Sequence, residues 1–336
     1  MSSMPRAVLL SRLAVALIGF AALTAYADDV APDKRDAQAW LKTIKEAAQK
    51  QSYAGTFVFQ QANQVRTSRV THMLDGKNEL EKLEILDGRP REYIRKNEEV
   101  ACYIPEIRTI MVEKRSTPDI FPAMVAANAP DLAEQYDIRK GDIARIAGYD
   151  CQTILMTPKD SLRYGYRLFA EKNTGLLLAA QTLNEKNQVI EQISFAQVMI
   201  GQIDKNSIRP SFPNTSGWHI ESSTAEQTAV SGWSVKAVPA GFKKIHELKR
   251  MVADAEPAAA GGVPGQHPLT QLVFSNGLAA ISVFIEPGTQ SRTEATLQQG
   301  ATNIVGKRQD GYWLTIVGEV PSAAVMQVAN SIEFKK

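Results

Sequence analysis

The sequence is poor in the side chains on which most catalysis depends. Its 336 residues include only four histidines, which are His72, His219, His246 and His267. Their spacing matches no metal-binding pattern: His246-Glu247 begins like a zinc-protease motif, but Arg250 stands where that motif requires a second histidine. No GxSxG or SxxK motif is present. We therefore expect no enzyme, no metal site and no cofactor, and a hydrolase is disfavoured.

A phosphate-binding loop is also missing. The stretch from Gly300 to Lys307 resembles one superficially, but five residues rather than four separate Gly300 from Gly306. Arg308 then replaces the required serine or threonine. The sequence therefore does not predict nucleotide binding.

Long apolar runs are absent except near the N-terminus. There the run from Leu13 to Leu23 is shorter than the ~20 residues that span a bilayer. It lies close to Arg6 and Arg12 and is followed by Ala25-Tyr26-Ala27, the small-x-small pattern that signal peptidase cuts. We expect residues 1–27 to be a signal peptide cleaved after Ala27, and the mature chain to be exported and soluble. No cysteine lies near the cleavage site, so a lipid anchor is not expected.

Neither sign of charge is in excess in the mature chain. Removing residues 1–27 takes away two arginines and no acidic residue, which leaves equal numbers of basic and acidic residues. Such a balance argues against bulk binding of nucleic acid. The remaining roughly 300 residues favour two domains, at ~100 to 200 residues per domain.

Cysteine is scarce. The two residues, Cys102 and Cys151, each lie in an apolar, strand-like stretch. In an oxidising compartment they are candidates for a disulfide, and a pair of unrelated buried thiols is the alternative. No CxxC motif suggests redox chemistry.

What the sequence does contain begins with a helix and a long series of strands. Helical spacing relates Ala37, Trp40, Leu41, Ile44, Ala47 and Ala48. From Tyr53 the period becomes two, and turn signals such as Asp75-Gly76 separate strands up to Ile200. Between Pro118 and Asp137 the pattern predicts two short helices. This indicates an α+β fold in which a large curved antiparallel sheet carries helices on one face.

A sheet that wraps helices commonly leaves an apolar cavity between the two layers. The side chains we expect to line it are Phe57, Phe59, Phe121, Met124, Val125 and Leu132. Ordinary core packing is the alternative, because Met and Phe at helical spacing usually belong to the core.

A second, smaller domain follows a polar connection. We assign residues 28–205 to the first domain, 206–230 to a linker and 231–336 to the second domain. The second domain reads as mainly antiparallel strands, with hairpin turns at Asn276-Gly277 and Asp310-Gly311 and a terminal helix. Its Ala-, Gly- and Pro-rich stretch from Ala253 to His267 is predicted to be a mobile loop.

Basic residues gather in two places. Lys243, Lys244, Lys249 and Arg250 interleave with apolar residues on a predicted strand, and Arg89, Arg91, Arg95 and Lys96 surround Pro90. Clustered cations form charge-assisted hydrogen bonds with acidic peptides or lipid phosphates. The first cluster is therefore our candidate partner or anion site, and a solvated strand face is the alternative.

Several short motifs, taken in order, resemble the RseB/MucB family. They are Leu86-Asp87-Gly88-Arg89-Pro90-Arg91-Glu92, Gly148-Tyr149-Asp150-Cys151, Tyr164-Gly165-Tyr166, Val238-Pro239-Ala240-Gly241-Phe242, Phe274-Ser275-Asn276-Gly277-Leu278 and Leu314-Thr315-Ile316-Val317-Gly318-Glu319-Val320-Pro321. The resemblance covers essentially the whole mature chain. The segment from Gly300 to Asn303 is more similar to the MucB branch of this family than to the RseB branch.

The resemblance implies a periplasmic regulator of the envelope-stress sigma factor. It implies a first domain similar to LolA/LolB lipoprotein carriers and a second domain that helps to bind the periplasmic region of a transmembrane anti-sigma factor of the RseA/MucA kind. Binding would protect that partner from regulated proteolysis, and lipid or lipopolysaccharide would weaken the complex. Self-association, as a homo-oligomer, is also implied. The loop from Ala253 to His267 has no counterpart in the family that we can place.

The rival interpretation is a soluble periplasmic carrier of lipid or lipoprotein, which would need only the first domain. The second domain discriminates between the two, because a pure carrier has no use for roughly a hundred extra residues with their own core.

Overall fold

The computed structural model describes residues 34–114, 121–125, 129–212, 214–223, 232–253, 266–288 and 292–334. The expected signal peptide, with its cleavage site at Ala27, lies outside these residues, as does most of the expected mobile loop before His267. Within the described ranges, no helix is both long enough and apolar enough to cross a membrane.

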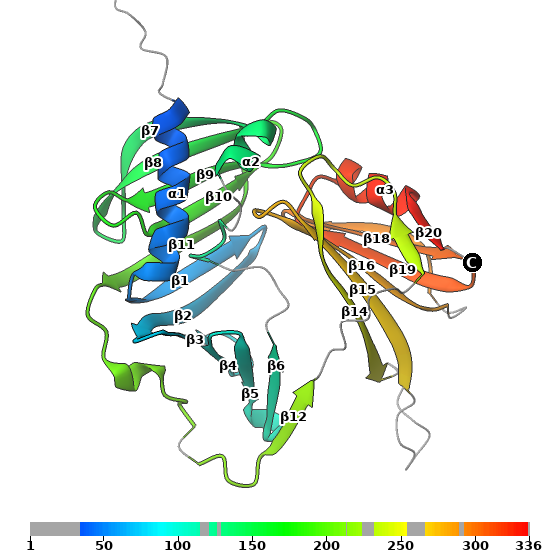
Figure 1. Cartoon of the computed structure of the whole chain (residues 1–336), viewed down its shortest axis with the longest axis horizontal. Coiled ribbons are helices and arrows are strands. Elements are labelled where there is room, and N and C mark those ends of the chain that lie inside the picture. The colour runs from blue at the N-terminus through cyan, green and yellow to red at the C-terminus, as the bar shows by residue number, and fades with distance from the viewer. Residues whose placement is uncertain are drawn as a thin grey trace, which may run out of the picture. The chain divides into compact units, whose positions relative to one another are not determined.

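The chain opens with the helix that the spacing of its apolar residues predicts. Helix α1 (Lys34–Lys50) buries Ala37, Leu41 and Ile44 almost completely, because these positions recur on one face. Its opposite face carries exposed Lys42 and Lys50. The buried face packs on a large sheet, across which α1 runs in Figure 1.

Twelve of the described strands form this sheet, in the order β12-β6-β5-β4-β3-β2-β1-β11-β10-β9-β8-β7. Their bounds are β1 (Tyr53–Gln61), β2 (Gln64–Asp75), β3 (Asn78–Ile85), β4 (Arg91–Lys96), β5 (Glu99–Ile104), β6 (Thr109–Lys114), β7 (Tyr136–Ile146), β8 (Tyr149–Pro158), β9 (Gly165–Glu171), β10 (Leu177–Leu183), β11 (Val189–Ile200) and β12 (His219–Ser223). A short 3₁₀ turn, η1 (Pro105–Ile107), joins β5 to β6. All neighbours pair antiparallel except β12, which is parallel to β6.

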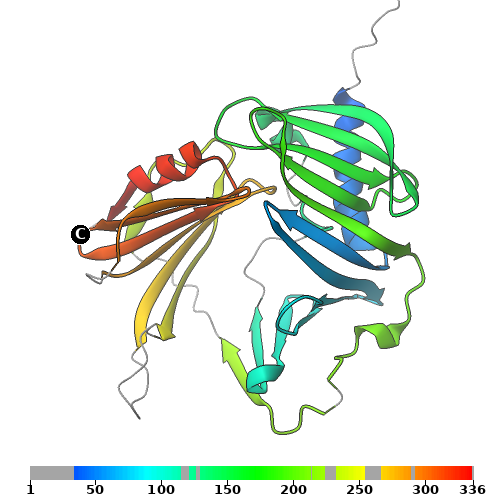
Figure 2. The ribbon, with the colours of Figure 1, turned by 180° about the vertical axis from the view of Figure 1, so that it is seen from behind.

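Strand β1 bends where its side chains meet the core. Its register with β11 shifts between Thr56 and Phe57. At the preceding position, Gly55 passes so close to the Gln197 carbonyl oxygen and the Phe195 ring that a Cβ atom would collide with both. Glycine at this position therefore permits the close approach of the two strands. Figure 2 shows the sheet from the side opposite α1.

The short helix α2 (Ala129–Gln135) lies beside α1 on the same face of the sheet. We predicted two short helices between Pro118 and Asp137, and α2 is one of them. The described residues Phe121–Val125 form a turn rather than a second helix, and the remaining part of this stretch lies outside the described ranges. Pro122 lies within this stretch and has no backbone N–H to donate to a helical hydrogen bond.

The first half of the expected linker folds onto the sheet. A 3₁₀ turn, η2 (Lys205–Ile208), buries Ile208, and the backbone of Arg209 and Ser211 is bonded to the β3 and β4 side chains Lys82 and Glu92. Strand β12 then joins β6. This docking depends on the long-range partners Lys82 and Glu92, so the polar local sequence does not predict it.

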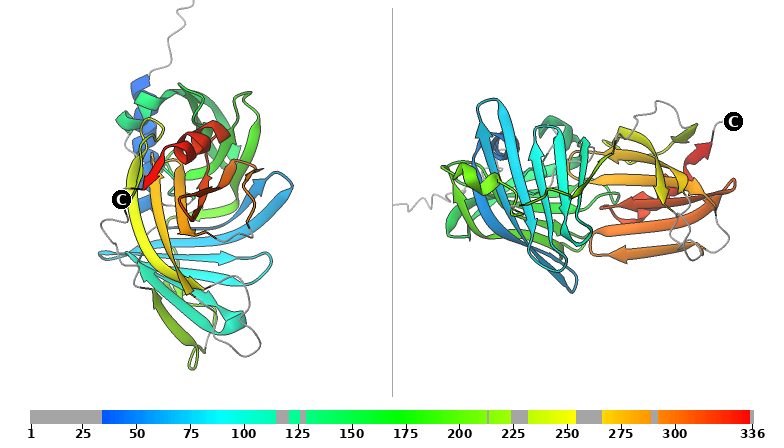
Figure 3. Two further views of the ribbon diagram at one scale, coloured as in Figure 1. Left: turned by 90° about the vertical axis from the view of Figure 1, so that its right-hand side faces the viewer. Right: turned by 90° about the horizontal axis from the view of Figure 1, so that it is seen from below.

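The second sheet contains six of the described strands, in the order β14-β15-β16-β19-β18-β17. Their bounds are β14 (Lys243–Ala253), β15 (Gln266–Ser275), β16 (Ala280–Pro287), β17 (Ala295–Gln299), β18 (Thr302–Gln309) and β19 (Tyr312–Gly318). Helix α3 (Ser322–Asn330) packs Val325 and Val328 on the sheet, and β13 (Trp233–Val235) pairs with β20 (Ile332–Phe334). Figure 3 shows α3 on this sheet from two further directions.

The predicted hairpin turns are confirmed. Asn276 and Gly277 connect β15 to β16, and the Asn276 side chain accepts hydrogen bonds from the backbone N–H groups of Leu278 and Ala279. Asp310 and Gly311 connect β18 to β19, both with positive φ angles, as a tight two-residue hairpin turn requires. The expected α+β class, with a large sheet over helices and a smaller sheet with a C-terminal helix, is confirmed. The exception is the parallel pair β6–β12, which makes the large sheet mixed.

The expected disulfide is not formed. Cys102 on β5 and Cys151 on β8 are both free thiols. Seven strands separate β5 from β8 in the sheet order, whereas a disulfide needs Cα atoms within about 7 Å. The alternative interpretation, two unrelated thiols, is the correct one.

Candidate functional site

Aromatic rings fill the space between the large sheet and its helices. Three phenylalanine rings contact one another here, with centroids 5.0 to 6.0 Å apart. They belong to Phe57 on β1, to Phe195 on β11 and to Phe121 in the turn before α2. All three are buried, with at most 6% of their surface exposed. Edge-on and tilted ring contacts at such distances are favourable packing geometry. The three rings therefore form a close-packed layer beneath the helices.

The structure brings most of the predicted cavity-lining residues into this one layer. Val125 and Leu132 are buried in the same core as Phe57 and Phe121, and Met124 packs against it with partial exposure. Phe59, two residues further along β1, is half-buried and lies outside that core cluster. These side chains thus provide the ordinary packing of the domain.

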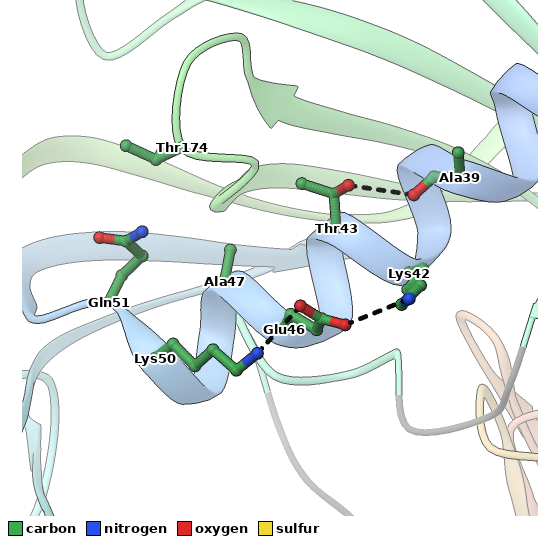
Figure 4. Close-up of a pocket in the computed structure, with 8 residues that line it drawn as sticks. All are labelled: Ala39, Lys42, Thr43, Glu46, Ala47, Lys50, Gln51 and Thr174. Atoms are coloured by element: carbon green, nitrogen blue, oxygen red, sulfur yellow. Dashed lines mark hydrogen bonds and ion pairs between the residues drawn. The ribbon is translucent and has the colours of Figure 1, made fainter.

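The surface groove along α1 does not have the character of a lipid site. The groove has a volume of about 380 Å³ and is lined by residues of α1, by Gln51 and by Thr174, as Figure 4 shows. Its floor is charged: Glu46 lies 3.0 Å from Lys50 and 3.8 Å from Lys42. Such i,i+4 pairs stabilise the helix itself by a few tenths of a kcal/mol each. The groove is therefore explained by the solvated face of α1.

The candidate partner residues lie on an edge strand. Lys243, Lys244, Lys249 and Arg250 are all exposed on β14, which is the first strand in the order of the second sheet. Lys244 forms an ion pair with Glu247 at 2.6 Å. The structure thus places the four cations along one open edge.

The second basic cluster is structural in large part. Arg95 on β4 is buried and donates to Glu79 at 2.7 Å and to Glu81 at 3.1 Å. His72, fully buried on β2, contacts Glu79 from the other side at 3.1 Å. The hydrogen bonds from His72 and then Arg95 lower the pKa of Glu79 to about 2. Arg91 pairs with Glu106. The charges around Glu79 therefore join β2, β3 and β4 to one another, and Arg91 links β4 to η1.

Sequence reasoning missed a set of contacts between the two sheets. Both sheets belong to one compact unit of the chain, Pro32–Lys336. Within it, Leu162 of the β8–β9 loop packs against the core of the second sheet, while Leu278 of the β15–β16 turn is buried in the core of the first. Arg163 pairs with Asp160 at 2.8 Å and donates to the Ala240 carbonyl oxygen at 2.9 Å. The β8–β9 loop is therefore one of the places where the first sheet contacts the second.

Three buried polar atoms at this contact, Tyr136 Oη, Arg163 Nη1 and Asn276 Nδ2, have no hydrogen-bond partner of good geometry among the described residues, although the Asn276 side chain lies near enough to the Tyr136 hydroxyl to interact with it. Arg163 stacks over the Tyr136 ring, 5.8 Å from its centroid. Burial raises the pKa of Tyr136, although the positive charge of Arg163 and the interaction with the Asn276 side chain oppose this. The only hint of this contact in the sequence is the turn motif at Asn276-Gly277, whose role looks purely local.

Two observations concern metal-binding and nucleophilic side chains in the described ranges. There, no group of three or more His, Cys, Asp or Glu side chains could hold a metal ion. Burial raises the pKa of Cys151 to about 11 and also raises that of Cys102, which suppresses the thiolate form that a nucleophile needs.

Comparison with known proteins identifies the two parts of the chain. The family model for the MucB/RseB N-terminal domain matches residues 36–212, and the model for the MucB/RseB C-terminal domain matches residues 227–333. The chain is 29% identical over 304 residues to the sigma factor AlgU regulatory protein MucB of Pseudomonas aeruginosa, covering 88% of this chain and 90% of that protein. The sigma-E factor regulatory protein RseB of Escherichia coli K12 is 22% identical over 296 residues, with the same coverage.

Solved structures show the same fold. The complex structure of Pseudomonas aeruginosa MucA/MucB matches with a TM-score of 0.69 and 27% identity, covering 90% of this chain and 99% of that one. A crystal structure of MucB in complex with MucA(peri) matches with a TM-score of 0.68, also at 27% identity, covering 90% of this chain and 100% of that one. The likeness therefore extends through both sheets.

Proposed function

Because this chain belongs to the MucB/RseB family, we propose that it is a non-catalytic periplasmic regulator that binds the periplasmic region of a MucA/RseA-type anti-sigma factor. The observation that carries the proposal is the match, over 90% of this chain, to MucB solved together with MucA. A match across both sheets supports a function that uses both, since a lipid carrier would need only the first. By this binding the protein restrains an envelope-stress sigma factor.

We further propose that the bound anti-sigma factor is protected from regulated proteolysis, and that lipid or lipopolysaccharide releases it from the complex. A ligand weakens a complex only by binding the free form more tightly than the bound form. We place the lipid in the layer around Phe57, Phe121 and Met124. A lipid that entered this layer would displace these side chains and shift the helices above them, so its affinity would differ between the free and the partner-bound protein. The β8–β9 loop, with Leu162 and Arg163, would carry that shift to the second sheet.

Calorimetric titration of the mature chain with the periplasmic domain of the anti-sigma factor tests this function. We expect tight binding that added lipopolysaccharide fragments weaken, and slower cleavage of the anti-sigma factor by its protease when this protein is bound. If the protein binds lipid but no anti-sigma factor, the carrier interpretation replaces the regulator.

A matched pair of variants tests the lipid route. Met124→Ser places a polar group at the partly exposed rim of the aromatic layer, and Met199→Ser makes the same change at a position on β11 where 54% of the side chain is already exposed. Under the proposal only Met124→Ser alters lipid sensitivity. Equal lipid responses in both variants would remove this layer from the mechanism.

A further inference from the structure

Strands β14 and β12 each form an outer edge of one of the two sheets. Among the described strands, β14 has β15 as its one neighbour and β12 has β6 as its one neighbour. An edge strand presents a row of unpaired backbone N–H and C=O groups, which an extended peptide can use as a template. With 11 residues, β14 presents an edge about 36 Å long.

The two edges share a groove. Its volume is about 430 Å³, and its lining includes Met111 beside β12, Ile220 and Glu221 on β12, and Arg250 and Met251 on β14. Ile220 has 63% of its surface exposed and Met251 has 57%. Two large apolar side chains exposed in one groove are typical of a surface that a partner covers.

The charge of the β14 edge indicates what kind of partner this is. Lys243, Lys249 and Arg250 are exposed and have no ion-pair partner among the described residues. At the opposite edge of the same sheet, β17 is entirely exposed and carries no charged residue at all. The positive charge is therefore a property of the β14 edge and not of sheet edges in general.

A solvated edge protected by lysines is the simpler explanation of those cations, because charged side chains discourage edge-to-edge pairing. It does not explain why Ile220 and Met251 are exposed beside them. A second copy of this chain is also a poor occupant, since β14 carries four basic residues and one acidic residue and two such strands repel each other.

We propose that the β14 edge receives an extended, acidic segment of the partner as an added strand, with an apolar side chain of that segment seated between Ile220 and Met251. This inference rests on the proposed function, since the segment belongs to the periplasmic region of the anti-sigma factor. Backbone hydrogen bonds supply affinity, and the cations and the groove supply selection for acidic and apolar side chains.

The contribution of the positive charge on β14 is tested with the double variant Lys249→Glu/Arg250→Glu of the mature chain. Calorimetric titration measures its affinity for the periplasmic domain of the anti-sigma factor. We expect Kd to rise at least tenfold and the dependence of affinity on salt to become weaker. Lys77→Glu/Lys186→Glu is the matched control, because it makes the same charge change at two exposed turns of the first sheet and should leave Kd within twofold of wild type.

The groove is tested with Ile220→Ser and Met251→Ser, against Leu297→Ser on β17. Leu297 has 62% of its surface exposed, so the control removes an equally exposed apolar side chain from the other edge. We expect only the two groove variants to weaken binding. In the wild-type complex, amide hydrogen exchange should slow along β14 and stay unchanged along β17.

The outcomes separate the two proposals. If wild-type protein does not bind the anti-sigma domain, the proposed function fails. If wild type binds and Lys249→Glu/Arg250→Glu binds as tightly as its charge control, or β14 amides gain no protection, the added-strand inference is overturned and the function stands. A dimer in sedimentation that Lys249→Glu/Arg250→Glu dissociates would show that a second copy occupies the edge, which also overturns it. Circular dichroism confirms that each variant is folded.

Discussion

Asn303 on β18 donates a hydrogen bond from Nδ2 to the hydroxyl oxygen of Tyr164, in the β8–β9 loop, at 3.1 Å. The same amide nitrogen donates to the Val320 carbonyl oxygen at 2.8 Å. Asn303 has 1% of its surface exposed and Tyr164 has 7%. One buried side chain therefore joins the loop of the first sheet to the C-terminal segment of the second.

Replacing this asparagine should loosen the contact between the sheets. Asn303→Ala leaves the Tyr164 hydroxyl and the Val320 carbonyl without their donor, which costs about 1–3 kcal/mol for buried groups. Tyr164→Phe removes only one of the two bonds and should cost less. Denaturant unfolding measures both, and a double-mutant cycle gives the coupling between the two residues. An additive cycle would mean that the bond contributes nothing.

Glu191 on β11 should make stability depend on pH. Its carboxylate accepts a hydrogen bond from Gln61 Nε2 at 2.9 Å. Burial, and then the negative charge of Glu319, raise the pKa of Glu191 to about 7. A carboxyl whose pKa is higher in the folded state holds its proton there after the unfolded chain has lost it. Stability should therefore fall as the pH rises from about 4.5 to 7, and the contribution of this group should level off above 7.

Glu191→Gln tests this dependence, because glutamine keeps the shape and stays neutral. Thermal unfolding between pH 5 and 8 should lose part of its pH slope in this variant. Glu185→Gln, at the exposed turn before β11, is the control. The same slope in both variants and in wild type would place the titrating group elsewhere.

The segment that follows β11 should be released by one substitution on β4. Glu92, 2% exposed, accepts a hydrogen bond from the Ser211 backbone N–H at 3.0 Å and lies 3.5 Å from Lys82 Nζ. Lys82 in turn donates to the Arg209 carbonyl oxygen. Glu92→Ala leaves the buried Lys82 with Glu84, 3.6 Å away, as its remaining carboxylate partner. The loss of one partner from a buried charge pair costs up to about 3–5 kcal/mol. Limited proteolysis should then cut near Ser211 faster than in wild type.

A double variant makes this prediction specific. Lys82→Met/Glu92→Met removes both buried charges and should be less destabilising than Glu92→Ala, because no buried lysine is left with only half of its carboxylate partners. If the double variant unfolds as readily as Glu92→Ala, packing rather than charge pairing holds the segment.

The two thiols should differ in reactivity. Cys102 is half-buried and Cys151 is fully buried, and burial raises the pKa of Cys151 to about 11. In the native mature protein, a thiol reagent at pH 8 should modify Cys102 slowly and Cys151 only after denaturant is added. Intact mass measurement before and after reduction checks the same point, and a difference of two hydrogens would contradict the free-thiol assignment.

Much of the architecture could be predicted from local patterns. The apolar positions from Ala37 to Ala48 recur at helical spacing, and α1 follows them because burying that face is what stabilises a helix of this length. The hairpins at Asn276 and Asp310 are encoded in dipeptides that favour positive φ. The short strands β17 and β20 were not predicted, because their formation depends on pairing with β18 and β13 rather than on their own sequences.

At the candidate site, too, the sequence predicts some features and leaves others to the fold. The exposed cations on β14 could be named from the sequence, since clustering of charge is a local property. Their position at an open edge, beside Ile220 from a strand more than twenty residues earlier, could not. Arg95 looked equivalent to those cations, and only the fold shows that Glu79 and Glu81 neutralise it.

The sequence by itself determined the α+β class, the order of the helices and most strands, the family and the absence of a recognisable catalytic motif, because each of these is written in local periodicity, turn chemistry and short motifs. Only the tertiary structure decided that the two cysteines stay apart, that the segment after β11 docks on Lys82 and Glu92, and that β12 and β14 share a groove. These features depend on which strands become neighbours. Strand order is set by the burial of the whole core, and no stretch of the chain encodes it alone.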